Sequence, residues 1–169
     1  MLNNTKYIDT LYSYENKQQM LIDAINMSDR LFNDELKNLD IYKYKYKSDV
    51  AVEELGLDAE LVDQLVEDYV GQILKASTYF IKYINELQDD KSNNKELDYT
   101  DLRELAHKNL GVARNLRIEN ARKLLYRIMK EDDLDYILKC LDGLMVSTVM
   151  LKPQCSYDTL KLMRIKDSI

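Results

Sequence analysis

The chain has 169 residues, of which 46% are hydrophobic and 32% are charged, and its formal net charge is −6. This length and composition predict one folded domain with an appendage, large enough to fold without a disulfide or a metal. Four glycines and one proline are too few for the turns of a β-sandwich or barrel, so long helices with short links are expected. The negative charge and the lack of a long basic stripe argue against nucleic acid as a partner.

Simple sequence features also argue against a metal site and a membrane span. Cys140 and Cys155 do not have the spacing of a metal motif or a disulfide framework, so both are predicted to be small apolar residues in or near the core. The first residues lack the apolar stretch of a signal peptide, and no run approaches the ~20 apolar residues of a membrane span. A cytoplasmic protein with reduced thiols and no membrane contact is therefore expected.

Residues 1–46 are predicted to form a helical extension at the N-terminus. An amphipathic helix is expected from Tyr14 to about Leu36, with an apolar stripe between Met20 and Phe32. This stripe must pack either on the rest of the chain or on a second copy, which would make a homodimer. The alternating Tyr-Lys run at 42–47 follows it. An extended linker or a short edge strand is the simpler interpretation, and a surface for single-stranded nucleic acid or a membrane is the alternative.

Helical periodicity dominates the rest of the chain and predicts an all-α fold. A short helix over 48–55 is expected to be capped by Ser48 and stopped by Gly56. Longer helices are predicted over 58–87, 99–116, 119–130 and 134–152, with a polar loop at 88–95 and a stop at Pro153. Gly71 inside the 58–87 helix suggests close packing there. Residues 47–152 are thus predicted to be an antiparallel four-helix bundle, followed by a C-terminal tail at 153–169.

His107, the only histidine, is the leading candidate for chemistry. The positions nearest its face of the 99–116 helix carry Arg103, Leu110, Gly111 and Arg114. An imidazole that is neutral near pH 7 can act as a nucleophile, and arginines can hold phosphate oxygens. Gly111 removes side-chain bulk beside the imidazole, at a cost to the helix of ~1 kcal/mol against alanine, so that another protein can approach.

The stretch from Leu105 to Leu116 resembles the signature of histidine phosphotransfer (HPt) domains, roughly A-H-x-L-K-G-x-A-x-x-L. The matching positions are Ala106, His107, Gly111, Ala113 and Leu116. The resemblance extends from about Asp49 to Leu151 in helix order. The sequence departs from the signature at two positions. Leu110 occupies the usual lysine position, and Asn109 occupies an apolar one.

The resemblance implies a phosphorelay carrier of two-component signalling. His107 would accept a phosphoryl group and relay it between a sensor kinase or receiver domain and a response regulator. It implies no nucleotide site and no cofactor on this chain, because the partner receiver domain supplies magnesium. Arg103, Lys108 and Arg114 are then the phosphate-stabilising candidates. Leu110 and Gly111 are expected at the partner-docking surface, with Leu110 exposed beside His107.

Two other classes of function stay open. In the first, the bundle is a non-catalytic adaptor that binds and inhibits a kinase or receiver domain without phosphotransfer, which the missing lysine favours. In the second, the chain is a structural helical protein whose N-terminal helix pairs with another copy. A phosphotransfer assay separates the adaptor from the carrier, because an adaptor binds its partner but takes up no label.

Overall fold

The computed structural model describes residues 6–167, and every regular element in this range is helical. The all-α prediction is therefore confirmed for these residues. The eight α-helices among them are α1 (Tyr7–Thr10), α2 (Lys17–Arg30), α3 (Asp49–Leu55), α4 (Ala59–Ser92), α5 (Thr100–Asn115), α6 (Glu119–Lys130), α7 (Leu134–Leu151) and α8 (Pro153–Asp167). Two single 3-10 turns, η1 (Leu11–Ser13) and η3 (Lys37–Leu39), and a π-helical turn, η2 (Leu31–Glu35), lie in the first 40 residues.

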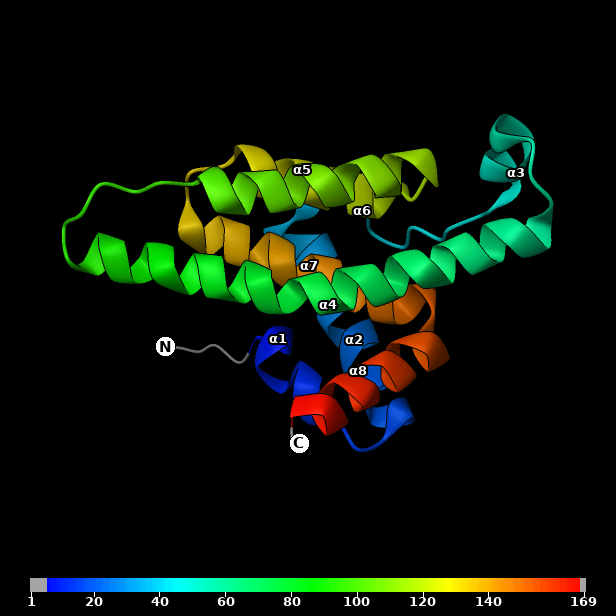
Figure 1. Ribbon diagram of the computed structural model, residues 1–169, viewed down its shortest axis with the longest axis horizontal. Helices are drawn as coiled ribbons and strands as arrows, with labels where there is room; N and C mark the ends of the chain where they lie inside the picture. Colours follow the sequence, from blue (N-terminus) through cyan, green and yellow to red (C-terminus); the bar gives the residue numbers. More distant parts are fainter. Residues whose placement is uncertain (1–5, 168–169) are drawn as a thin grey trace.

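Helices α4 to α7 pack side by side (Figure 1). Helix α5 contacts α4 and α6, and α7 contacts α6 and α4. Residues 116–118 and 131–133 are the only links between α5, α6 and α7, and such short links force successive helices to run antiparallel. Helix α7 is buried over most of its length, since α4 and α6 cover part of it and the N-terminal helices cover another part.

The N-terminal helices and α8 lie on the other side of α4 from α5 (Figure 1). Tyr7, Met20, Ala24 and Phe32 belong to the same hydrophobic core as the buried residues of α4 to α7. The apolar stripe of α2 packs on α7 of its own chain, which is one of the two arrangements expected for it. A homodimer through this segment stays a prediction.

Several helix bounds differ from the sequence-based expectation. Helix α4 continues to Ser92, through most of the expected polar loop, because residues such as Gln88 and Lys91 favour a helix even where nothing packs on them. The expected tail instead forms α8, which begins at Pro153. A proline is well suited to the first position of a helix, where its missing N–H is not needed.

The close packing expected at Gly71 is found at Gly143 instead. A Cβ on Gly71 would meet nothing within 4 Å. A Cβ on Gly143 of α7 would lie 3.0 Å from Phe32 Cε1, 3.1 Å from Leu124 Cδ2 and 3.2 Å from Leu36 Cδ1. Two segments, the η2 turn with its end at Leu36 and helix α6, therefore converge on Gly143, and the expectation for Gly71 was wrong.

The Tyr-Lys segment, residues 42–47, is a linker that begins with a turn at Tyr42 and Lys43, and it is not a strand. The Tyr46 hydroxyl donates to Leu116 O at 2.8 Å, and the Tyr44 hydroxyl accepts from Glu119 N at 3.1 Å. Both bonds attach the segment to the turn between α5 and α6. Two of the three aromatic rings that suggested a nucleic-acid or membrane surface, Tyr44 and Tyr46, are thus half-buried against the chain's own helices, whereas Tyr42 is exposed.

Candidate functional site

His107 lies on the outer face of α5 and is exposed to solvent, as predicted. The opposite face of α5 is buried through Leu102, Ala106, Leu110 and Ala113. These positions recur every three or four residues, so a single stripe of α5 anchors it to α4 and α6. The histidine is therefore held at the surface by a rigid element.

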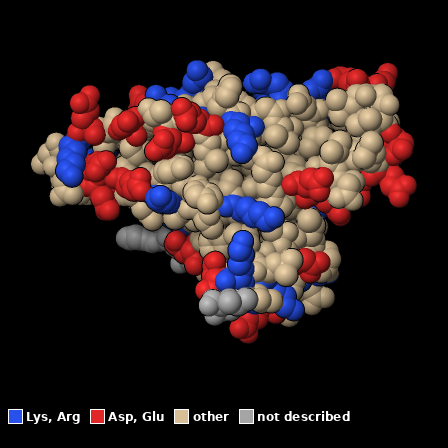
Figure 2. Space-filling view, viewed as in Figure 1, with Lys and Arg blue, Asp and Glu red and all other residues tan. Residues whose placement is uncertain are grey.

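An open hollow surrounds the imidazole, and we call it the His107 hollow. Its lining residues are Thr100, Arg103, Glu104 and His107 of α5 and Met129 and Lys130 of α6. Two basic residues, Arg103 and Lys130, line the hollow together with His107, against the single carboxylate of Glu104. In Figure 2, basic side chains also lie along the upper edge of the molecule, where Figure 1 places α5. The hollow can therefore hold an anion beside His107.

Lys130 is a site residue that sequence analysis missed. It is the last residue of α6, 23 positions after His107 in the chain. The antiparallel pairing of α5 and α6 brings this end of α6 beside the first half of α5. The basic last turn of the predicted 119–130 helix was the available signal, but it has meaning only once the pairing of the two helices is known.

Arg103 lines the hollow but already has partners. Its Nη2 donates to Asp132 Oδ1 at 2.6 Å, and its guanidinium carbon lies 4.7 Å from the centre of the Tyr99 ring. Among the described residues, nothing accepts a hydrogen bond from its buried Nε. Asp132 is largely exposed, and exposed ion pairs contribute only ~0–1 kcal/mol. An incoming anion can therefore compete with Asp132 for Arg103.

Leu110 is not at the surface, so the expectation of an exposed docking contact was wrong. The leucine is 2% exposed. It lies four residues after Ala106 and three before Ala113, on the buried stripe. A position three residues after His107 is rotated by ~60° from it, and here that rotation turns the side chain toward the core.

Asn109 is also buried, at 1% exposure, but its polar atoms are satisfied. Its Nδ2 donates to Leu105 O at 2.9 Å, and its Oδ1 accepts from Gln72 Nε2 of α4 at 2.9 Å. The polar residue in this position of the signature thus joins α5 to α4. Its hydrogen bonds hold the helix that carries His107 in place.

The other predicted site residues do not converge on the imidazole. Lys108 and Arg114 are exposed, but neither is among the described residues that line the His107 hollow. Arg114 lies two turns away, which is ~10 Å along the helix axis. Gly111 is half-buried, and a Cβ there would meet nothing within 4 Å. The chain's own packing therefore does not require a glycine at this position.

Within residues 6–167, no group of three or more His, Cys, Asp or Glu side chains is arranged to hold a metal ion. Cys140 is buried and Cys155 is partly buried, as predicted. Burial raises the pKa of the Cys140 thiol to about 12, so this thiol is protonated at neutral pH and is not a nucleophile. No helix in the described range is both long and apolar enough to cross a membrane.

The chain has no match among protein-family models, curated proteins or solved structures.

Proposed function

We propose that this protein is a histidine phosphotransfer carrier and that His107 is the phosphorylated residue. The observation that carries the proposal is the exposed imidazole in an open hollow with Arg103 and Lys130. This imidazole lies in the stretch of α5 that resembles the HPt signature. Its partners would be a receiver domain, a hybrid kinase or a response regulator in the cytoplasm.

We also propose that α4 to α7 form an antiparallel four-helix bundle of the HPt kind, with the N-terminal helices as an addition. The support is the closed ring of contacts, α4 to α5, α5 to α6, α6 to α7 and α7 to α4. In such a bundle the outer face of one helix can present a histidine while the inner faces share a core.

The chemistry needs little from this chain beyond a nucleophile and positive charge. The lone pair of an unprotonated imidazole nitrogen forms a P–N bond as the P–O bond to a receiver's aspartate breaks, and the aspartate leaves as a carboxylate. Transfer to the next receiver runs the same exchange in reverse. The partner's magnesium ion and active site supply most of the transition-state stabilisation.

Lys130 takes the place of the lysine that the HPt signature has in the position of Leu110. Lys130 lines the hollow from the end of α6, with its Nζ 6.0 Å from the centre of the Tyr126 ring. A rotation of this exposed side chain can bring the ammonium group to phosphoryl oxygens on the imidazole. Arg103 adds a second cation when the phosphoryl group displaces Asp132. Lys108 and Arg114 lie outside the hollow and suit contacts with the acidic surface of a partner.

Phosphorylation of the protein by a phosphorylated receiver or kinase tests this proposal. We expect acid-labile, base-stable label on the native chain and none on His107→Gln. Label retained in that variant would exclude His107 as the acceptor. Because His107 is exposed, the substitution should leave the unfolding transition unchanged, and this control separates loss of the acceptor from loss of the fold.

Lys130→Gln tests the role of the second helix. We expect transfer to slow by roughly 10-fold, which corresponds to about 1.4 kcal/mol of lost stabilisation. Lys161→Gln is the matched control, because Lys161 is exposed on α8, on the other side of α4 from α5. Equal rates for the two variants would remove Lys130 from the site.

A non-catalytic adaptor is the second candidate, favoured by the leucine in place of the signature's lysine. Position 110 of α5 carries an uncharged leucine, and its side chain is buried in the core. An adaptor would bind a receiver or kinase and inhibit it with no label on His107. Co-purification of receiver-containing proteins, followed by the labelling assay on the same complex, distinguishes the two functions.

A further inference from the structure

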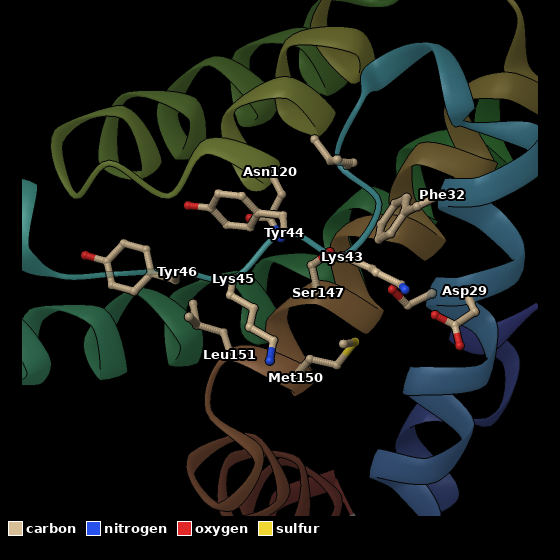
Figure 3. Close-up of a pocket in the computed structure, with 12 residues that line it drawn as sticks. Asp29, Phe32, Lys43, Tyr44, Lys45, Tyr46, Asn120, Ser147, Met150 and Leu151 are labelled. Carbon is tan, nitrogen blue, oxygen red and sulfur yellow. The ribbon is translucent and has the colours of Figure 1, made fainter.

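A second hollow, which we call the Ser147 pocket, lies at the other end of α6 from His107. It has a volume of about 460 Å³, within the range of roughly 300–1,000 Å³ found for small-molecule sites. The Tyr-Lys segment forms one wall, and α7 and η2 form the others (Figure 3). Asn120, near the start of α6, lines this pocket, whereas Met129 and Lys130, at the end of α6, line the His107 hollow.

Ser147 provides the pocket with a buried hydroxyl group that has no hydrogen-bond partner among the described residues. The residue is 8% exposed, and among the described residues nothing donates to or accepts from its Oγ. A helical serine or threonine ordinarily bonds the carbonyl four residues before it, as the neighbouring Thr148 does with Leu144 O at 2.7 Å. The Ser147 side chain instead points toward the Tyr-Lys segment across the pocket (Figure 3). A buried hydroxyl with no partner costs free energy unless a ligand satisfies it.

The charges of the wall favour an anion with a single charge. Lys43 and Lys45 both line the pocket, and Asp29 is the only acidic residue among its lining residues. Neither ammonium group is in an ion pair within residues 6–167. Lys43 extends toward Asp29, and Lys45 extends toward Met150 and Leu151 (Figure 3). Two lysines and one aspartate leave one positive charge, which matches a monoanion such as a carboxylate.

Four of the remaining lining residues are apolar and suit a hydrocarbon body, beside two tyrosines and the polar Ser28 and Asn120. Phe32 and Ile41 are buried side chains on one side, and Met150 and Leu151 lie at the end of α7. Apolar walls with a few convergent polar groups are the usual composition of a small-molecule site. Lys43 also has a φ of 63°. A non-glycine residue rarely adopts this left-handed conformation, and such strain often accompanies a binding site.

We propose that the Ser147 pocket binds a small organic carboxylate with an apolar body. The Ser147 hydroxyl donates to the carboxylate, Lys43 and Lys45 attract it, and the body packs on Phe32, Met150 and Leu151. This inference is independent of the proposed phosphotransfer function, because none of the lining residues of the two hollows is shared.

The test is a titration of the full chain with three probes. Binding is monitored by NMR through the backbone amide signals of the residues that line the pocket. Octanoate carries both the charge and the apolar body, acetate carries only the charge, and octylammonium has the same body with the opposite charge. We expect saturable shifts with octanoate, at a Kd of about 1 mM or tighter, and none with the other two. No saturable shift with octanoate, or an equal response to octylammonium, would overturn the proposal.

Substitutions separate a binding role from a structural one. Ser147→Ala should weaken octanoate binding by roughly 10-fold and raise the melting temperature of the ligand-free chain, because an unsatisfied hydroxyl has been removed. A lower melting temperature would mean that the hydroxyl has a partner, and the proposal would fail. Lys43→Gln with Lys45→Gln should also weaken binding, whereas Lys47→Gln, on the same segment but outside the pocket, should not.

Discussion

Tyr69 of α4 has a buried hydroxyl without a partner in the described part of the core. Its side chain is 1% exposed, and its hydroxyl has no hydrogen-bond partner among the described residues. Burial raises the pKa of this phenol well above its usual value, so the group stays neutral. On folding, the hydroxyl loses its hydrogen bonds to water and forms none within the described part of the protein, which costs free energy.

Tyr69→Phe should therefore stabilise the protein by about 1 kcal/mol. Urea unfolding followed by circular dichroism measures this change. Tyr46→Phe is the matched control, because the Tyr46 hydroxyl donates to Leu116 O at 2.8 Å and its loss should cost about 0.5–1.5 kcal/mol. If both variants are destabilised alike, the Tyr69 hydroxyl has a bonding partner and the interpretation fails.

Gly143 of α7 is the residue at which packing is tightest. Phe32, Leu36 and Leu124 surround it, and all three are buried. Because Phe32 and Leu36 come from the η2 turn and Leu124 from α6, they cannot all move away from a new methyl group. Gly143→Ala should destabilise the protein by about 1–3 kcal/mol through overpacking. Gly71→Ala, where a Cβ meets nothing within 4 Å, should not. A Gly143→Ala protein as stable as the native one would show that the site can relax.

At the scale of the element, α5 combines a tightly anchored inner face with an exposed outer face. Asn109 fixes the inner face to Gln72 of α4. On the outer side, Gly111 follows His107 by one turn and has open space where a Cβ would be. A glycine inside a helix costs about 0.5–1 kcal/mol against alanine, and no described residue packs close enough to the Gly111 Cβ position to require it.

Gly111→Ala should raise the stability of the protein by about 0.5–1 kcal/mol and yet slow phosphotransfer. The gain comes from helix propensity, and the slower rate comes from a methyl group where the partner approaches. Gly71→Ala is the matched control, since it should give the same gain in stability with an unchanged transfer rate. Thermal unfolding and the labelling assay on the same preparations measure both effects. An unchanged transfer rate in Gly111→Ala would show that Gly111 is not needed to leave space for the partner.

At the scale of the whole molecule, Asp142 joins the N-terminal segment to α7. Its Oδ1 accepts the backbone N–H of Ile8 at 3.0 Å, and the side chain is 4% exposed. Burial raises the pKa of this carboxyl to about 6, although the backbone donors of Ile8 and Tyr7 partly oppose the shift. The folded state therefore holds a proton on Asp142 at pH values where the unfolded chain has released it.

Through this group the protein should become more stable as the pH falls from 7 to 5. A carboxyl whose pKa is higher in the folded state binds more protons there, so the free energy of unfolding decreases as the pH rises. The effect over this pH range should be about 1 kcal/mol. Asp142→Asn keeps the acceptor for Ile8 and should lose this dependence, as measured by urea unfolding at several pH values. Parallel pH profiles for the native chain and the variant would contradict the assignment.

Local sequence patterns predicted most elements of this fold. The helix at 119–130 was predicted with its observed bounds, and Gly56 ends α3 with a φ of 68°, as a C-terminal stop requires. The α8 helix was missed because its apolar positions are few and Pro153 was interpreted only as a stop. The end of α4 was misplaced because a polar composition is typical of both a loop and an exposed helical turn.

The sequence by itself determined the all-helical class, the positions of the main helices and the outward direction of His107. These features depend on the 3.6-residue period and on capping residues, which act within a few positions of the chain. Only the tertiary structure decided that Lys130 lies beside His107 and that Arg103 is held by Asp132. It also decided that Ser147 faces a pocket closed by the Tyr-Lys segment. Such contacts join residues far apart in the chain, so they depend on how whole helices pair and not on any local pattern.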